Sequence, residues 1–105
     1  MSWRDWIWMP RSIVDREWYT EPSTFIVLVD LLFSASTEPE SWQGIPLKRG
    51  QAIVCRRKLS VRLGISEQAV RTALRHLETS GDITIQPTSQ YLIITICSFD
   101  DYDFE

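Results

Sequence analysis

Apolar residues recur at helical spacing through residues 57–81, RKLSVRLGISEQAVRTALRHLETSG. In the second half of this segment they follow the i, i+3, i+4, i+7 pattern of one buried helix face. These positions are Val70, Ala73, Leu74 and Leu77. Before them, Leu59 and Leu63 stand four apart on a shorter helix, and Gly64 supplies the backbone freedom for a turn. The pattern therefore predicts two helices joined by a tight turn.

The ends and the outer face of the second helix indicate what it is for. Ser66 can accept a backbone N–H as N-cap, and Gly81 suits a C-terminal stop. The polar positions opposite the apolar face are Gln68, Thr72, Arg75 and Thr79, with Arg71 on the flank. Such a pair is typical of a DNA-binding helix-turn-helix, whose second helix enters the major groove. An ordinary amphipathic hairpin with a solvated polar face would show the same periodicity.

Periodicity also predicts the elements that precede this pair. Glu21-Pro22-Ser23 marks a helix start, and TFIVLVDLLFSAS continues it. Its apolar positions at helical spacing are Phe25, Leu28, Val29, Leu32 and Phe33. A polar loop is expected at residues 37–44, followed by extended chain that bends at Arg49-Gly50.

After Gly81, the β-branched runs ITIQ and YLIITI are separated by PTSQ, which predicts a hairpin at residues 82–98. The order helix, strand, helix, turn, helix, hairpin is that of a winged helix. We therefore expect one α+β domain, mainly α, over residues 1–105: a winged helix-turn-helix with a C-terminal β-hairpin wing. The acidic tail, residues 99–105, is expected to fray beyond Phe99.

Residues 1–20 form an aromatic N-terminal extension that holds Trp3, Trp6 and Trp8. Trp6 and Trp8 alternate as on a strand, and Pro10 ends the run. The following RSIVDREWY predicts a short helix whose packing residues are Ile13, Val14, Trp18 and Tyr19. Two interpretations of the three tryptophans stay open: they cap the chain's own core, or they form the interface of a homodimer.

Charge is strongly segregated along the chain, although the net charge is only −3. Residues 47–77 carry eight basic side chains and one acidic, whereas residues 78–105 carry six acidic and no basic side chains. The positive block coincides with the helix-turn-helix and the strand before it. Because phosphate neutralisation supplies most non-specific affinity for DNA, this coincidence favours binding of double-stranded DNA.

The candidate DNA-contacting residues come from both helices and from the wing loop. They are Arg56, Arg57, Lys58, Arg62, Gln68, Arg71, Thr72, Arg75, Thr88 and Ser89. The wing loop, residues 86–90, carries no positive charge, so its contacts would use hydroxyl and amide groups.

No set of residues in the sequence has the composition and spacing expected of a catalytic site. The only histidine, His76, lies within the second helix of the pair, and Cys55 and Cys97 have neither the spacing nor the number for a metal site or a disulfide framework. No catalytic residue, metal or cofactor is expected. The N-terminus lacks the pattern of a signal peptide, and the apolar run at residues 25–33 is short and interrupted by Asp30, so we expect a cytoplasmic protein without a membrane span.

The sequence resembles the winged-helix domain of phage replisome-organiser and DnaD-type replication proteins. The resemblance runs through PRSIVDREWYTEPSTFIVLVDLLFSA, WQGIPLKRGQAIVCRRKLSVRLGISEQAVRTALRHLETSGDITI and YLIITI. It implies a bacterial or phage origin, assembly of replication proteins on DNA, and self-association. By position, Arg57 and Lys58 would open the first helix of the helix-turn-helix pair. The recognition helix, which is the second of the pair, would be lined by Gln68, Arg71, Thr72 and Arg75.

The chain departs from the family in three respects. Cys55 stands where members commonly have Ser or Thr, so an N-cap is missing; the wing loop has no Lys; and the second domain of DnaD-type proteins has no counterpart in these 105 residues. A DNA-binding role in replication initiation is the leading hypothesis. A winged-helix transcriptional regulator, or an assembly module with little DNA affinity of its own, is the alternative.

Overall fold

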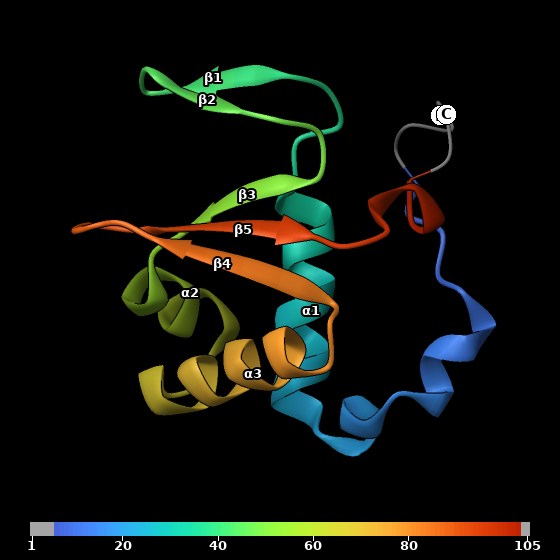
Figure 1. The fold of residues 1–105 in the computed structure, drawn as a ribbon. Coiled ribbons are helices and arrows are strands. Elements are labelled where there is room, and N and C mark those ends of the chain that lie inside the picture. The colour runs from blue at the N-terminus through green and yellow to red at the C-terminus, as the bar shows by residue number, and fades with distance from the viewer. Residues whose placement is uncertain (1–5, 104–105) are drawn as a thin grey trace.

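Three α-helices lie on one side of a three-stranded antiparallel sheet in the computed structural model, which describes residues 6–103 (Figure 1). The helices are α1 (Pro22–Ser34), α2 (Arg56–Leu63) and α3 (Glu67–Thr79). The sheet contains β3 (Gln51–Val54), β4 (Ile83–Pro87) and β5 (Leu92–Ile96) in the order β3-β5-β4. Buried aliphatic side chains join the two layers. The chain is therefore α+β, as the sequence predicted.

The phase and the ends of α3 agree with the prediction. Its apolar positions Val70, Ala73, Leu74 and Leu77 are each at most 2% exposed. The Ser66 hydroxyl accepts the backbone N–H of Ala69 at 3.0 Å and so caps the first turn. At the other end Gly81 takes a left-handed φ of +84°, and the N–H of Asp82 donates to the Leu77 carbonyl at 2.9 Å. This Schellman arrangement ends the helix and directs the chain into β4.

α2 begins at Arg56 and ends where Gly64 takes a φ of +71°. Its Leu59 is buried and its Leu63 half-buried, so the predicted inner face is confirmed. Cys55 precedes the helix and provides no side-chain cap, which confirms the missing N-cap. The backbone N–H groups of the first turn are therefore not satisfied by a capping side chain.

α1 buries a different face from the one predicted. Its buried residues are Thr24, Val27, Leu28, Leu31 and Leu32. Phe33, predicted on the inner face, is 69% exposed, and Phe25 and Val29 are only half-buried. The prediction was wrong because residues 25–33 are apolar everywhere except at Asp30, so the pattern allows several helical phases. The ion pair of Asp30 with Arg62 and the packing of α1 on α3 select the observed phase.

The first strand and the turn of a hairpin occupy part of the segment predicted as a polar loop, and the second strand lies in the predicted extended chain. β1 (Glu40–Trp42) pairs antiparallel with β2 (Ile45–Leu47), and the intervening Gln43 and Gly44 have φ of +48° and +83°. Positive φ at both central positions is type I′ geometry, which matches the twist of a two-residue hairpin. The hairpin could not be predicted from hydrophobic periodicity, because its strands have only three residues each and the segment is largely polar.

The predicted C-terminal hairpin is present. β4 pairs with β5 from Ile83 opposite Ile96 to Pro87 opposite Leu92, and β3 pairs with the other edge of β5. Alternate residues of the sheet face the helices and are buried: Ala52, Val54, Ile83, Leu92, Ile94 and Ile96. Figure 1 shows the β1–β2 and β4–β5 turns on the same side of the molecule as the start of α3.

The N-terminal segment forms no strand at residues 6–10, so the strand suggested by the alternation of Trp6 and Trp8 is wrong. Two 3-10 helices, η2 (Arg11–Asp15) and η3 (Glu17–Thr20), replace the single predicted helix, because Arg16 is extended between them. Of the four side chains predicted to pack, Ile13 and Trp18 are buried, and Val14 and Tyr19 are exposed.

Asp82 fastens this segment to the turn between α3 and β4. Its Oδ2 accepts hydrogen bonds from Trp18 Nε1 at 2.7 Å, from Arg16 Nη2 at 2.8 Å and from Ser80 Oγ at 2.6 Å. Trp18 is 1% exposed, so its indole N–H needs this buried acceptor. The position of the segment therefore depends on one carboxylate far away in the sequence.

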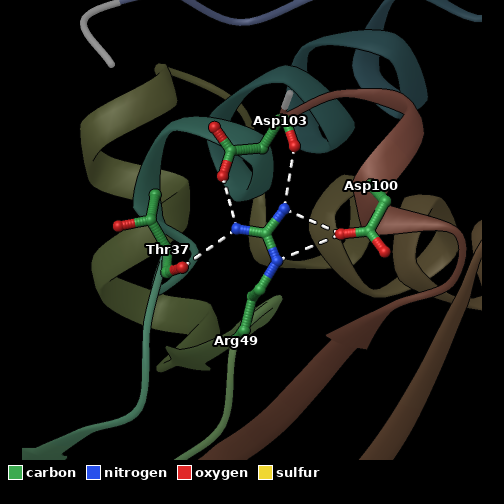
Figure 2. A network of polar contacts seen from close by, with 4 residues as sticks. All are labelled: Thr37, Arg49, Asp100 and Asp103. Atoms are coloured by element: carbon green, nitrogen blue, oxygen red, sulfur yellow. Dashed lines mark hydrogen bonds and ion pairs between the residues drawn. The ribbon is translucent and has the colours of Figure 1, made fainter. Parts of the chain in front are cut away.

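The C-terminal tail is docked on the fold, which overturns the expected fraying beyond Phe99. Residues Phe99–Asp101 form the 3-10 helix η4, and Tyr102 and Asp103 are buried. Arg49 reaches into the tail, where its guanidinium donates to Asp100, to Asp103 and to the carbonyl of Thr37 (Figure 2). No local sequence pattern indicates this contact, because the partners lie in segments remote from each other.

Candidate nucleic-acid interface

The basic side chains of residues 47–77 do not form one continuous face. The C-terminal tail holds Arg49, and Arg62 pairs with Asp30 at 2.5 Å between Nη2 and Oδ2. Six exposed cations make no ion pair within the described part of the chain: Lys48, Arg56, Arg57, Lys58, Arg71 and Arg75. The charge available to an outside ligand is therefore smaller than the sequence total suggests.

A groove of about 300 Å³ runs between the first turns of α2 and α3 and the turn of the β4–β5 hairpin. Arg56 and Arg57 line it from α2, and Arg71 lines it from α3. Thr88 and Ser89 border it from the hairpin turn. Five of the candidate DNA-contacting residues, from three separate elements, thus meet around one groove.

The start of α2 adds backbone charge to this groove. Because Cys55 does not cap the helix, the first N–H groups of α2 are available to an acceptor. Aligned peptide dipoles also place about half a positive charge at a helix N-terminus. Phosphate oxygens suit such a site. Glu67 lines the same groove, so the charge along the groove is not positive everywhere.

The outer face of α3 is polar and internally linked. Gln68 Oε1 accepts from Arg71 Nη1 at 3.3 Å, and Gln68 Nε2 donates to Thr72 Oγ1 at 3.4 Å. Both contacts are long, so they leave these groups free to exchange partners with a ligand. Gln68 and Thr72 line a separate hollow with the start of α1 and do not line the groove.

Arg75 has different surroundings from Arg71. It lines a hollow with Glu17 and Glu21 of the N-terminal segment, whereas Arg71 lines the groove with Arg56 and Arg57. Two carboxylates beside Arg75 lower the local positive potential. The two arginines are therefore not equivalent, although periodicity placed both on the outer face.

Lys58 and Arg62 line a second cleft on the other side of the start of α2. Trp42 and Tyr91 line the same cleft, with their ring centroids 6.0 Å apart. The sequence pattern does not identify Trp42 as a surface residue of this region, because residues 37–44 predict a polar loop and not a strand. A lone tryptophan in a polar, proline-containing stretch is the signal that would have identified it.

Thr88 is part of the hairpin turn. Its hydroxyl donates to the Tyr91 carbonyl at 2.8 Å and accepts from the Tyr91 N–H at 3.0 Å. The hydroxyl proton is therefore used within the chain, and the turn is held in one conformation. Ser89 and Gln90, both exposed, are the polar side chains that the turn presents outward.

The N-terminal tryptophans remain largely outside the core. Trp6 is 58% exposed and Trp8 is 56% exposed, while Trp3 lies outside the described residues. The backbone N–H of Trp8 donates to the Tyr102 carbonyl at 2.7 Å. Trp18 instead packs near Phe25, at 6.4 Å between ring centroids.

His76 serves the fold on the flank of α3. Its Nδ1 lies 2.5 Å from Oε1 of Glu21, the residue before α1. The hydrogen bond from His76, followed by that from Thr24, lowers the pKa of Glu21 below its ordinary value. Within residues 6–103, no group of His, Cys, Asp and Glu is placed to hold a metal ion, and no helix has the length and apolarity to cross a bilayer.

The residues gathered here are three arginines, an uncapped helix start and a polar hairpin turn. Comparison with known proteins gave no match: no protein-family model fits the chain, and no curated protein or solved structure is significantly similar to it. Phosphate binding is the chemistry that this set of donors suits best.

Proposed function

We propose that the chain is a winged helix-turn-helix domain that binds double-stranded DNA. The order α1, β3, α2, α3, β4, β5 supports this proposal, because a winged helix has the same sequence of elements. The sheet order β3-β5-β4 supports it as well, since the strand before the helix-turn-helix lies beside the last strand of the wing. In this assignment α3 is the recognition helix and the β4–β5 hairpin is the wing.

The observation that carries the proposal is the groove lined by Arg56, Arg57 and Arg71. In the proposed complex, the exposed face of α3 enters the major groove and offers Gln68 and Arg71 to base edges. The start of α2 receives a backbone phosphate through its N–H groups and its two arginines. The wing turn follows the neighbouring backbone through Ser89 and Gln90.

For the biological process we propose DNA replication initiation in a bacterium or a phage. This rests on the resemblance to replisome-organiser and DnaD-type proteins described above. Control of transcription is the alternative, because a winged helix serves both processes with the same contacts.

Fluorescence anisotropy with a labelled duplex across a salt series tests the binding proposal. Each phosphate contact contributes a slope of about −0.9 in log K against log salt. The double variant Arg56→Ala/Arg57→Ala should therefore lose about two units of that slope. Lys48→Ala is the matched control, because Lys48 is exposed but does not line the groove.

The same experiment separates the proposal from an assembly role. A protein-assembly module would show no duplex affinity even at low salt, and the double variant would then behave as the parent chain does. That result would reject DNA binding and would favour a protein partner for this face.

A further inference from the structure

Trp42 and Tyr91 bring the two hairpins into contact. Trp42 ends β1 and Tyr91 precedes β5, and their rings meet edge to face, at an interplanar angle of 66°. After this contact Trp42 remains 38% exposed. Trp42 is therefore still partly open to solvent, next to the turn of the β1–β2 hairpin.

The cleft beside this ring pair has a volume of about 280 Å³. Ile53 and Leu59 contribute apolar surface to it, and Lys58 contributes a cation that has no ion pair within residues 6–103. Arg62 also lines the cleft, but its guanidinium is paired with Asp30. Among the described residues, no carboxylate lines the cleft. Aromatic rings next to a cation are the combination that binds single-stranded nucleic acid by base stacking and phosphate neutralisation.

The cleft adjoins the groove proposed for duplex DNA. Val54, Cys55, Gln90 and Tyr91 line both cavities. The start of α2 stands between them, with Arg56 and Arg57 on one side and Lys58 on the other. A strand that leaves a duplex in the groove would therefore meet the cleft next.

A bracing role for Trp42 would explain only part of this arrangement. The ring contact with Tyr91 stabilises the position of the wing, as aromatic pairs do. Bracing does not account for Lys58, which is exposed and makes no ion pair within residues 6–103. Nor does it require a cleft free of acidic side chains in a chain whose net charge is −3.

We propose that the cleft between Trp42, Tyr91 and Lys58 binds an unstacked base of a single-stranded segment next to the bound duplex. The inference rests on the proposed function, because the duplex in the groove delivers the strand. A base inside a duplex has both faces covered by its neighbours, so only an unpaired base offers a face to the indole. Lys58 neutralises the phosphate beside that base. The preferred ligand is thus DNA with a tail or fork rather than blunt duplex.

Three labelled DNAs test the inference by anisotropy: a blunt duplex, the same duplex with a thymidine tail, and the thymidine strand alone. Base–aromatic stacking predicts that the tail tightens binding about tenfold. Trp42→Leu keeps an apolar side chain against Tyr91 but removes the stacking face, so it should abolish the gain from the tail. Trp42→Phe should retain most of that gain. Phe33→Leu is the matched control, because Phe33 is an exposed aromatic that does not line the cleft.

Photocrosslinking from 5-iodouracil in the tail gives a second readout on the unaltered chain, in case Trp42→Leu impairs folding. Peptide mapping should place the crosslink at Trp42 or Tyr91. Crosslinks confined to other peptides, or equal affinity of the parent chain for tailed and blunt duplex, would overturn the inference while the proposed function stands. No binding of blunt duplex by the parent chain would instead overturn the proposed function, and this inference with it.

Discussion

Arg49 and Asp103, which are 54 residues apart in the sequence, form an ion pair at 2.7 Å between Nη1 and Oδ2. The Asp103 side chain is 4% exposed and that of Arg49 is 25% exposed. Arg49 also donates to Asp100 (Figure 2). Its guanidinium carbon lies over the ring of Phe99, at 5.0 Å from the ring centroid. Gly50 permits this close approach, because a Cβ there would lie 3.0 Å from the Phe99 Cβ. The fold thus pairs a cation of the basic block with two carboxylates of the acidic tail.

Arg49→Ala should destabilise the fold by about 3 kcal/mol, because it leaves the buried carboxylate of Asp103 without its cation. Urea denaturation followed by circular dichroism measures the change. Lys48→Ala, at the exposed neighbouring position, should shift the unfolding free energy by less than about 0.5 kcal/mol. Equal and small effects of the two substitutions would mean that the tail does not dock in solution.

The phase of α1 can be tested at two adjacent residues. Leu32 is 2% exposed and Phe33 is 69% exposed. Leu32→Ala should cost about 2–5 kcal/mol of unfolding free energy, as large-to-small core changes do. Phe33→Ala should cost less than about 0.5 kcal/mol, which is typical of surface sites. The face predicted from periodicity contained both residues, so a large loss at Phe33 would restore that face.

How much of the fold the sequence predicts depends on how informative each segment is. In α3, polar residues separate the apolar positions, so Val70, Leu74 and Leu77 identify one face and the observed helix agrees with it. In α1 nearly every residue is apolar, and the buried face is decided by contacts with α2 and α3 that periodicity does not contain. Local patterns predict local structure, whereas the pairs Arg49–Asp103 and Trp18–Asp82 are tertiary.

The candidate site was predictable as a set of basic residues but not as a surface. Arg56, Arg57 and Arg71 meet in the groove, because α2 and α3 begin at the same end of the fold. Charge counting could not show that Arg62 pairs with Asp30, since the partner lies on another helix. The second cleft escaped prediction for the same reason: it depends on how two hairpins pack.

Arg71→Ala and Arg75→Ala should have unequal effects on DNA binding. Loss of a base contact by Arg71 should cost roughly 1–3 kcal/mol of binding free energy. Arg75 should matter less, because the hollow that it lines also holds Glu17 and Glu21, whose negative charge repels phosphate. Anisotropy with one duplex compares the two variants at fixed salt. A larger loss at Arg75 would place the DNA across the C-terminal half of α3 instead.

The Glu21–His76 contact predicts a pH dependence of stability. Hydrogen bonding from His76 lowers the pKa of Glu21 from 4.5 in the folded chain. The stabilisation is therefore fully present above about pH 4.5 and is lost as the pH falls through the lower folded pKa. Melting temperatures of the parent chain and Glu21→Gln should differ at pH 6 and converge toward pH 3. Glu38→Gln, at an exposed residue without a hydrogen bond in the described range, should give the same melting curve as the parent at every pH.

We expect the chain to form a homodimer through its N-terminal aromatic segment. Trp6 is 58% exposed and Met9 is 39% exposed. They are three residues apart in the sequence, and exposed apolar side chains that gather into a patch usually mark an interface. A two-fold dimer would set two recognition helices at a fixed spacing on DNA, so that two weak half-site contacts act together. Sedimentation velocity over a range of concentrations compares the parent with Trp6→Ser. Phe33→Ser is the control, because it removes an even more exposed aromatic, 69%, from a different surface. The parent and the control should dimerise, and Trp6→Ser should not. If the parent chain and both variants all sediment as monomers, the exposed tryptophans have another role. A single recognition helix would then have to provide the DNA affinity.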